Sequence, residues 1–192
     1  MYPHNLWILK PGENTNKGRD IIVLENEEQI RQQVRSQLYV ENRTFILQKY
    51  IERPLLYQKR KFDIRCFMLV TSMNKKIKAY WYSEGYLRTT GKEYTCKNVS
   101  RDIHLTNDAV QKQFDNYGKY ESANKVSFAD FEKYLDNLPE NEGEPGIFRR
   151  KVYPLMKSIA TDATRSTFMK MDPKRVESGF ELYGMDYISQ TQ

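Results

Sequence analysis

Short apolar runs along the chain predict β-strands. The clearest run is residues 61–72, where apolar side chains alternate with Asp63 and Arg65 at its start. Alternation with a period of two is typical of a strand that buries one face. Other apolar runs have strand length and end at turn-forming residues. The pattern therefore also predicts strands at 6–10, 21–24, 44–51, 76–90 (with a turn at 84–85 and a short return) and 179–188.

Apolar residues recur at helical spacing in the first half of the chain at one place, residues 26–38. Ile30, Val34 and Leu38 lie four residues apart there, and Asn26 is suited to cap the first turn. This spacing predicts an amphipathic helix. Residues 107–120 show a similar pattern, which predicts a second helix beginning after Asn107.

Two further helices are expected in the second half of the chain. Ser127 with Asp130 three residues later resembles a capping box and predicts a helix over 127–138. A helix at about 147–169 is kinked or restarted at Pro154. Its pattern predicts that Val152, Leu155, Met156, Ile159 and Ala163 point inward. Strands come early, helices late, and a last strand returns to the sheet, so the order indicates an α+β fold.

Composition narrows the class of protein only slightly. The 192 residues carry 31 Lys and Arg against 25 Asp and Glu, a net charge of +6, and 39% of them are hydrophobic. This length and apolar content suit one domain or two small ones with a packed core. The positive excess favours anionic partners such as nucleotides, nucleic acids or acidic proteins. The apolar runs are too short to span a membrane.

Charged side chains interrupt the apolar pattern near the ends of several predicted strands. Lys10 precedes a polar, glycine-containing loop, an arrangement that suits phosphate binding through backbone amides. Lys61, Asp63 and Arg65 alternate, so all three point to one face of their strand. That face lines a cleft or, in the alternative interpretation, belongs to an edge strand with its charges in water. Asp186 lies in the last predicted strand and is compatible with a turn as well.

Several segments together resemble the tubulin tyrosine ligase-like family, which has the ATP-grasp fold. They occur in the family's order and are "NLWILKPGENTNKG", "QKYIERPLL", "RKFDIR", "GYLRTT", "HLTN" and "FELYGMD". The resemblance implies an α+β ATP-grasp fold with an antiparallel or mixed sheet and flanking helices, of which only the central and carboxyl-terminal parts are present. It places a central subdomain at residues 1–52 and a carboxyl-terminal subdomain, cut before its last metal-binding strand, at 53–192.

The resemblance also implies a nucleotide site. Lys10 is expected to hold ATP phosphates under the loop of residues 11–21. Lys61 is expected to contact the phosphates or the base, and Asp63 the ribose. The adenine pocket and the remainder of the nucleotide site are expected at Gln48, Lys49, Tyr50, Ile51, Thr106 and Asn107.

The same resemblance implies the reacting groups. Arg65 and Arg88 are the expected catalytic residues, facing the acidic substrate and the γ-phosphate, and Asp186 is the expected Mg²⁺ ligand. The implied activity is an ATP-dependent ligase that joins a free amino acid (glutamate, glycine or tyrosine) to the glutamate-rich carboxyl-terminal tail of tubulin through an acyl phosphate. Glutamate is favoured because glutamylating members are the most numerous. The implied location is the cytoplasm and the microtubule cytoskeleton, including a cilium or basal body.

Two departures from the family pattern support a different interpretation. Asp20 stands where the family loop carries a second glycine, and its charge lies close to the expected phosphates. The family's E-x-N metal ligands follow Asp186 by about a dozen residues, whereas the sequence ends at Gln192. A fragment, or a non-catalytic relative that binds nucleotide or tubulin, is therefore the alternative. A basic nucleic-acid-binding domain is the third candidate, but the sequence carries no motif of that class.

Overall fold

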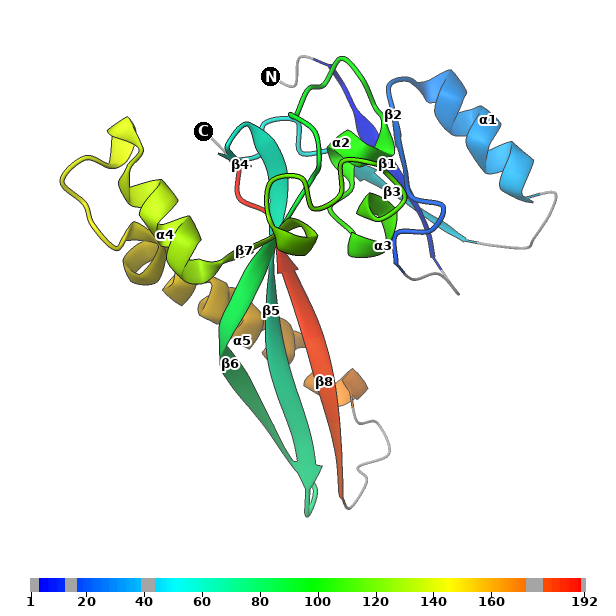
Figure 1. Cartoon of the computed structure of the whole chain (residues 1–192). Coiled ribbons are helices and arrows are strands. Elements are labelled where there is room, and N and C mark those ends of the chain that lie inside the picture. Colours follow the sequence, from blue (N-terminus) through cyan, green and yellow to red (C-terminus); the bar gives the residue numbers. More distant parts are fainter. Residues whose placement is uncertain (1–3, 13–16, 39–43, 172–177, 191–192) are drawn as a thin grey trace. The chain divides into compact units, whose positions relative to one another are not determined.

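The computed structural model describes residues 4–12, 17–38, 44–171 and 178–190 (Figure 1). The chain forms two compact units. Unit 1 comprises residues 1–62, 88–125 and 188–192, and unit 2 comprises residues 63–87 and 126–187. These units are discontinuous in sequence, and their bounds differ from the expected division after residue 52, which stays a prediction. The mixture of helices and antiparallel sheets confirms the α+β fold class.

Unit 1 contains a three-stranded antiparallel sheet, with an amphipathic helix between its second and third strands in the sequence. The strand order is β2-β1-β3, with Trp7 opposite both Leu24 and Lys49. The backbone N–H of Gln29 donates to Asn26 Oδ1 at 2.9 Å, which confirms Asn26 as the cap of the helix. The elements are β1 (Trp7–Pro11), β2 (Ile22–Leu24), α1 (Glu27–Leu38) and β3 (Phe45–Lys49).

The apolar side chains along one face of α1 are only partly covered. Ile30 and Val34 are half-buried, and the side chain of Leu38 lies outside the described residues. The core of this part of unit 1 is formed by Leu6, Val23 and Tyr50.

The rest of unit 1 is built from short elements. The expected helix at 107–120 is wrong beyond its first turn, because only Asp108–Gln111 is α-helical. Gln111 is fully buried, and its side-chain amide donates to the carbonyls of Asp102 and Leu105 at 3.2 and 2.6 Å. After this anchor the chain continues in tight turns and reaches Gly118 at φ 74°. The elements are β4 (Leu56–Tyr57), α2 (Arg101–His104), α3 (Asp108–Gln111) and η1 (Ser122–Asn124).

Unit 2 is organised around a long β-hairpin. Its two strands meet at Asn74 and Lys75, which both have positive φ (50° and 63°), as a tight two-residue hairpin turn requires. The last strand pairs antiparallel with the first strand of the hairpin, from Ile64 opposite Tyr187 to Met73 opposite Ser178. The strands are β5 (Arg60–Met73), β6 (Lys76–Thr89), β7 (Lys125–Ser127) and β8 (Ser178–Tyr187). Residues 60–62 of β5, 88–89 of β6 and 125 of β7 belong to unit 1.

The turn expected at Glu84 and Gly85 is wrong, since β6 runs through both residues. Gly85 serves a close approach instead. A Cβ atom on Gly85 would come within 2.4 Å of the Arg65 carbonyl oxygen and 2.6 Å of the Phe128 ring.

The capping box at the start of α4 is confirmed. The backbone N–H of Asp130 donates to Ser127 Oγ at 3.1 Å, and Phe128 and Phe131 are buried. Phe128 packs against Phe148 with ring centroids 4.9 Å apart. The helical elements of unit 2 are α4 (Phe128–Asp136), η2 (Pro139–Asn141), η3 (Phe148–Val152, a π-helical turn) and α5 (Tyr153–Met171).

Helix α5 lies along the β5–β6 hairpin, and only part of the face expected to point inward does so (Figure 1). Met156 and Ala160 are buried, whereas Leu155 and Ile159 are 61% and 47% exposed, so the expected inward orientation of these two residues is wrong. Val152 and Ala163 are half-buried. Among the described residues, no helix is long and apolar enough to cross a membrane.

Candidate functional site

A pocket in unit 1 with both polar and apolar walls brings together six of the residues expected to bind nucleotide. Its volume is about 80 Å³, and its walls are Ile8, Lys10, Gln48, Lys49, Tyr50, Ile51, Lys61 and Ile188. The pairing of β1 with β3 explains part of this grouping, because Ile8 lies directly opposite Gln48. Residues two apart on a strand share a face, so Lys10 lies on the same side as Ile8.

Two of the pocket lysines are held by neighbouring residues through hydrogen bonds. Lys10 Nζ donates to Gln48 Oε1 at 2.8 Å. Lys49 Nζ donates to the Leu6 carbonyl and to Glu52 Oε1, both at 2.7 Å. Burial by itself would raise the pKa of Glu52, but hydrogen bonds from Lys49 and from backbone N–H groups lower it below its ordinary value. The carboxylate of Glu52 therefore stays ionised and balances the charge of Lys49.

The third lysine, Lys61, is buried and held by a chain of hydrogen bonds. Lys61 Nζ donates to the Tyr50 hydroxyl oxygen and to the His104 carbonyl, each at 2.8 Å. The Tyr50 hydroxyl lies 2.7 Å from His104 Nδ1, and His104 Nε2 lies 2.7 Å from the Asn98 carbonyl oxygen. A carbonyl oxygen only accepts, so Nε2 carries the hydrogen and Nδ1 accepts from Tyr50. Every bond in the chain thus has a fixed direction, from Lys61 to Asn98.

Tyr50 and His104 are both neutral at pH 7. Burial lowers the pKa of His104 to about 4, and the positive charge of Lys61 acts in the same direction. Burial also raises the pKa of Tyr50. The ammonium group of Lys61 is consequently the only formal charge in this group of three, and it is fixed at the wall of the pocket.

The described end of the glycine-containing loop packs against the segment that holds Thr106 and Asn107. Arg101 Nη2 donates to the Gly18 carbonyl at 2.9 Å, and a Cβ on Gly18 would come within 2.9 Å of the Asn107 side chain. Thr106 is buried, and residues 13–16 lie outside the described part of the loop. Asp20 has φ 57°, a left-handed conformation that glycine adopts freely and aspartate tolerates.

The expected catalytic and metal-binding residues, and Asp63 of the expected nucleotide site, are divided between the units. Arg88 is buried in unit 1, whereas Asp63, Arg65 and Asp186 belong to unit 2. Arg65 lies opposite Asp186 on β5 and β8, and its Nε and Nη2 atoms donate to the two carboxylate oxygens at 2.5 and 3.2 Å. The edge-strand interpretation is wrong: β5 pairs with strands on both sides, and Lys61 and Asp63 are each 5% exposed.

The comparison with known families decides the assignment. The sequence model of the "Tubulin-tyrosine ligase family" matches residues 1–192. The chain belongs to the tubulin-tyrosine ligase family. The resemblance drawn from the sequence segments is thereby confirmed.

Relatives of this family member are similar over nearly its whole length. It is 34% identical over 188 residues to Tubulin glycylase 3B of Drosophila melanogaster, covering 96% of this chain and 24% of that protein. It is 33% identical over 190 residues to Protein monoglycylase TTLL8 of Mus musculus, covering 96% of this chain and 21% of that protein. Tubulin glycylase 3D of Tetrahymena thermophila is 32% identical over 189 residues, covering 97% and 17%. The chain thus spans about a quarter or less of the relatives' length.

The described residues of this family member contain no cluster of three metal-binding side chains. No three His, Cys, Asp or Glu side chains lie close enough together in the described part to hold one ion. The carboxylate of Asp186 is taken up by Arg65, and Mg²⁺ binding there stays a prediction.

Sequence reasoning did not identify four residues that shape the pocket. Ile8 and Ile188 line it, while His104 and Glu52 orient the lysines. His104 belongs to the "HLTN" segment, so that segment was a usable signal. Its contact with Tyr50 joins residues 54 positions apart, which no local pattern reports.

Proposed function

We propose that the chain carries the ATP-binding part of a ligase that attaches glycine to the acidic tail of tubulin. The observation that supports this proposal is the pocket of unit 1, because it groups Lys10, Lys49 and Lys61 with polar and apolar walls. Membership of the tubulin-tyrosine ligase family supports ATP as the energy source.

The pocket suits a polyanion with a planar base. Lys61 presents an ammonium group whose position is fixed by Tyr50 and His104, and Lys10 reaches from the end of β1. Ile8, Ile51 and Ile188 supply apolar surface for a base. The volume of about 80 Å³ is smaller than the ~300 Å³ of a typical small-molecule site, so this pocket accommodates only part of a nucleotide.

The proposed reaction requires positive charge for a clear reason. A carboxylate does not react with an amine at neutral pH, because its oxygen is a poor leaving group. Transfer of the γ-phosphoryl group of ATP gives an acyl phosphate, from which the amine of the incoming amino acid displaces phosphate. Negative charge accumulates at phosphorus during the transfer, and fixed lysine and arginine side chains stabilise it. In this proposal Lys61 holds the nucleotide and Arg65 and Arg88 face the transferred group and the acceptor carboxylate.

Glycine replaces glutamate as the favoured amino acid. Several similar relatives are named glycylases, among them Tubulin glycylase 3B and Protein monoglycylase TTLL8. The preference for glutamate in the sequence analysis rested only on the number of glutamylating members. The acidic acceptor suits the net charge of +6, and a location on the cytoskeleton follows from the proposed substrate.

A second candidate is a relative that binds nucleotide without turnover. The ion pair between Arg65 and Asp186 favours it, because each residue neutralises the other and neither is then available for a phosphate or a metal.

Incorporation of labelled amino acids into tubulin tests the proposal and separates the two candidates. The complete protein from its native source is incubated with ATP, tubulin and either labelled glycine or labelled glutamate. We expect label from glycine in the tubulin tail, located by mass spectrometry of tail peptides. Incorporation of glutamate, or of labelled tyrosine in a parallel reaction, would contradict the amino acid assignment, and ATP binding without incorporation of any of the three would establish the second candidate.

A further inference from the structure

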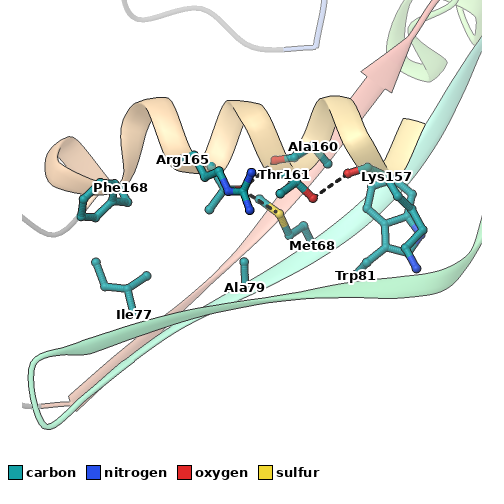
Figure 2. Close-up of a pocket in the computed structure, with 10 residues that line it drawn as sticks. Met68, Ile77, Ala79, Trp81, Lys157, Ala160, Thr161, Arg165 and Phe168 are labelled. Carbon is teal, nitrogen blue, oxygen red and sulfur yellow. Dashed lines mark hydrogen bonds between the residues drawn. The ribbon is translucent and has the colours of Figure 1, made fainter. Parts of the chain in front are cut away.

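Unit 2 contains a second pocket, which the proposed function does not use. It lies between α5 and the β5–β6 hairpin and has a volume of about 270 Å³ (Figure 2). Met68 and Ala79 lie beneath the helix, Ile77 faces Phe168 at one end, and Trp81 lies at the other end. All of these residues belong to one compact unit, so the pocket is a feature of that unit alone.

Small residues create the pocket. Ala160 and Thr164 are one turn apart on α5, where larger side chains would fill the space above Ala79. The Thr164 hydroxyl donates to the Ala160 carbonyl at 2.8 Å and also contacts Met68 Sδ at 3.3 Å. Because the hydroxyl is satisfied locally, the interior presents mainly apolar atoms. A large apolar side chain of a ligand can therefore enter the pocket without leaving a buried polar group of the protein unpaired.

The helix side of the pocket carries two exposed cations. Lys157 and Arg165 both line the pocket and are exposed to solvent. They are eight residues apart on α5, which separates their Cα atoms by ~12 Å along the helix axis. In the described part of the chain, neither forms an ion pair with a carboxylate. The pocket therefore combines an apolar floor with two positively charged side chains at its helix side.

We propose that this pocket binds an acidic peptide segment that carries one large apolar side chain. The apolar side chain fills the space between Trp81 and Phe168, and carboxylates on either side of it pair with Lys157 and Arg165. The pocket volume lies just below the ~300 Å³ at which pockets begin to enclose drug-sized molecules. The pocket therefore has room for one large side chain, while the rest of a peptide stays outside it. The spacing of the two cations matches carboxylates spread over several residues of an extended chain.

This site is independent of the nucleotide pocket. The proposal uses no residue of unit 1 and no ATP, so it holds or fails separately from the proposed ligase activity.

Tryptophan fluorescence provides the test. The chain has two tryptophans, so Trp7→Phe leaves Trp81 as the single reporter inside the pocket. This variant is titrated with three capped pentapeptides, in which phenylalanine is flanked by glutamates, alanine by glutamates, or phenylalanine by lysines. We expect a saturable change with the first peptide and affinities at least tenfold weaker for the other two. Equal binding of the alanine peptide or the lysine peptide would overturn the proposal.

Pocket variants in the Trp7→Phe background locate the binding. Ala79→Leu fills the pocket from an exposed position and should abolish binding, and Arg165→Gln should weaken it about tenfold. Lys170→Gln, an equal change of charge on α5 outside the pocket, is the matched control and should bind as the parent does. Thermal unfolding establishes that each variant is folded. If Ala79→Leu unfolds, Arg165→Gln against Lys170→Gln still decides, since equal affinities in that pair would overturn the assignment.

A small amphiphile distinguishes another kind of ligand. Hexanoate carries one carboxylate and an apolar chain that the pocket admits. Binding of hexanoate with no binding of the phenylalanine–glutamate peptide would overturn the peptide assignment. Binding of the peptide, with hexanoate at least tenfold weaker, would support it, because only the peptide engages both cations.

Discussion

Replacing Tyr50 by phenylalanine should destabilise unit 1 far more than the loss of one hydroxyl group normally does. The Tyr50 hydroxyl accepts a hydrogen bond from Lys61 and donates one to His104, at 2.8 and 2.7 Å. Tyr50 is 3% exposed and Lys61 5% exposed, so water cannot readily replace either bond. Tyr50→Phe therefore leaves a buried ammonium with one acceptor fewer and a buried imidazole nitrogen without its donor.

The magnitude follows from these two losses. A hydrogen bond from a charged group contributes about 1.5–3 kcal/mol, and one between neutral groups about 0.5–1.5 kcal/mol. Phenylalanine regains part of this because no hydroxyl has to be desolvated. The free energy of unfolding should therefore fall by roughly 2–4 kcal/mol, as measured by urea denaturation.

Tyr117→Phe is the matched control in the same unit. The Tyr117 hydroxyl donates a single hydrogen bond, to Asp108 Oδ1 at 2.6 Å, in a partly exposed position. Asp108 is charged, but the partly exposed position lets water replace the bond, so its loss should cost about 1 kcal/mol, less than the loss for Tyr50→Phe. A loss for Tyr50→Phe that is no larger than the loss for Tyr117→Phe would refute the role assigned to the hydrogen-bond chain.

Three further changes test other parts of the structure by urea denaturation. His104 has a pKa of about 4 in the folded chain, against an ordinary value of 6.5. Between these two pH values the imidazole is protonated in the unfolded chain but not in the folded chain, so protonation favours unfolding. The free energy of unfolding should therefore fall by about 2 kcal/mol between pH 7.5 and 5 because of His104. A His104→Gln variant should lack this contribution to the pH dependence, and an identical pH profile in the variant and the parent would contradict the assignment. Ser127→Ala should lose about 1 kcal/mol because it removes the cap of α4, whereas exposed Ser166→Ala should lose under about 0.5 kcal/mol. Gly85→Ala should lose about 1–3 kcal/mol, because its Cβ would come within 2.4 Å of a carbonyl oxygen; an unchanged midpoint would show that the close approach is relieved cheaply.

Helix caps encoded by neighbouring residues were predicted correctly from the sequence. The cap formed by Ser127 and Asp130 is an example, because both partners lie within one helical turn. The helix after Asn107 was overestimated, since the side chain of Gln111 bonds to carbonyls of the preceding segment, at Asp102 and Leu105, and the chain then turns. The inward face of α5 was assigned wrongly at Leu155, because packing on the hairpin rather than apolar spacing sets the rotation of the helix.

The candidate site was predictable to the extent that family segments carry it. Such segments named six residues that line the unit 1 pocket. They did not indicate that the ring of His104 holds Tyr50, or that Glu52 balances Lys49, because these contacts depend on the folded chain. The same holds for Gly85, where a strand passes too close to its neighbours for any side chain, whereas the local sequence indicated a turn.

ATP binding to two matched lysine variants tests the central claim most directly. Lys61→Met removes the buried ammonium of the unit 1 pocket, and Lys78→Met removes the same charge from an exposed position on β6. Isothermal titration of ATP should give an affinity for Lys78→Met within about twofold of the parent. For Lys61→Met the ATP affinity should be at least tenfold weaker, which corresponds to ~1.4 kcal/mol. The reason is that the variant loses a fixed positive charge that contacts the phosphates or the base. Equal ATP affinity in the parent and both variants, with all three folded, would contradict the assignment of this pocket to the nucleotide.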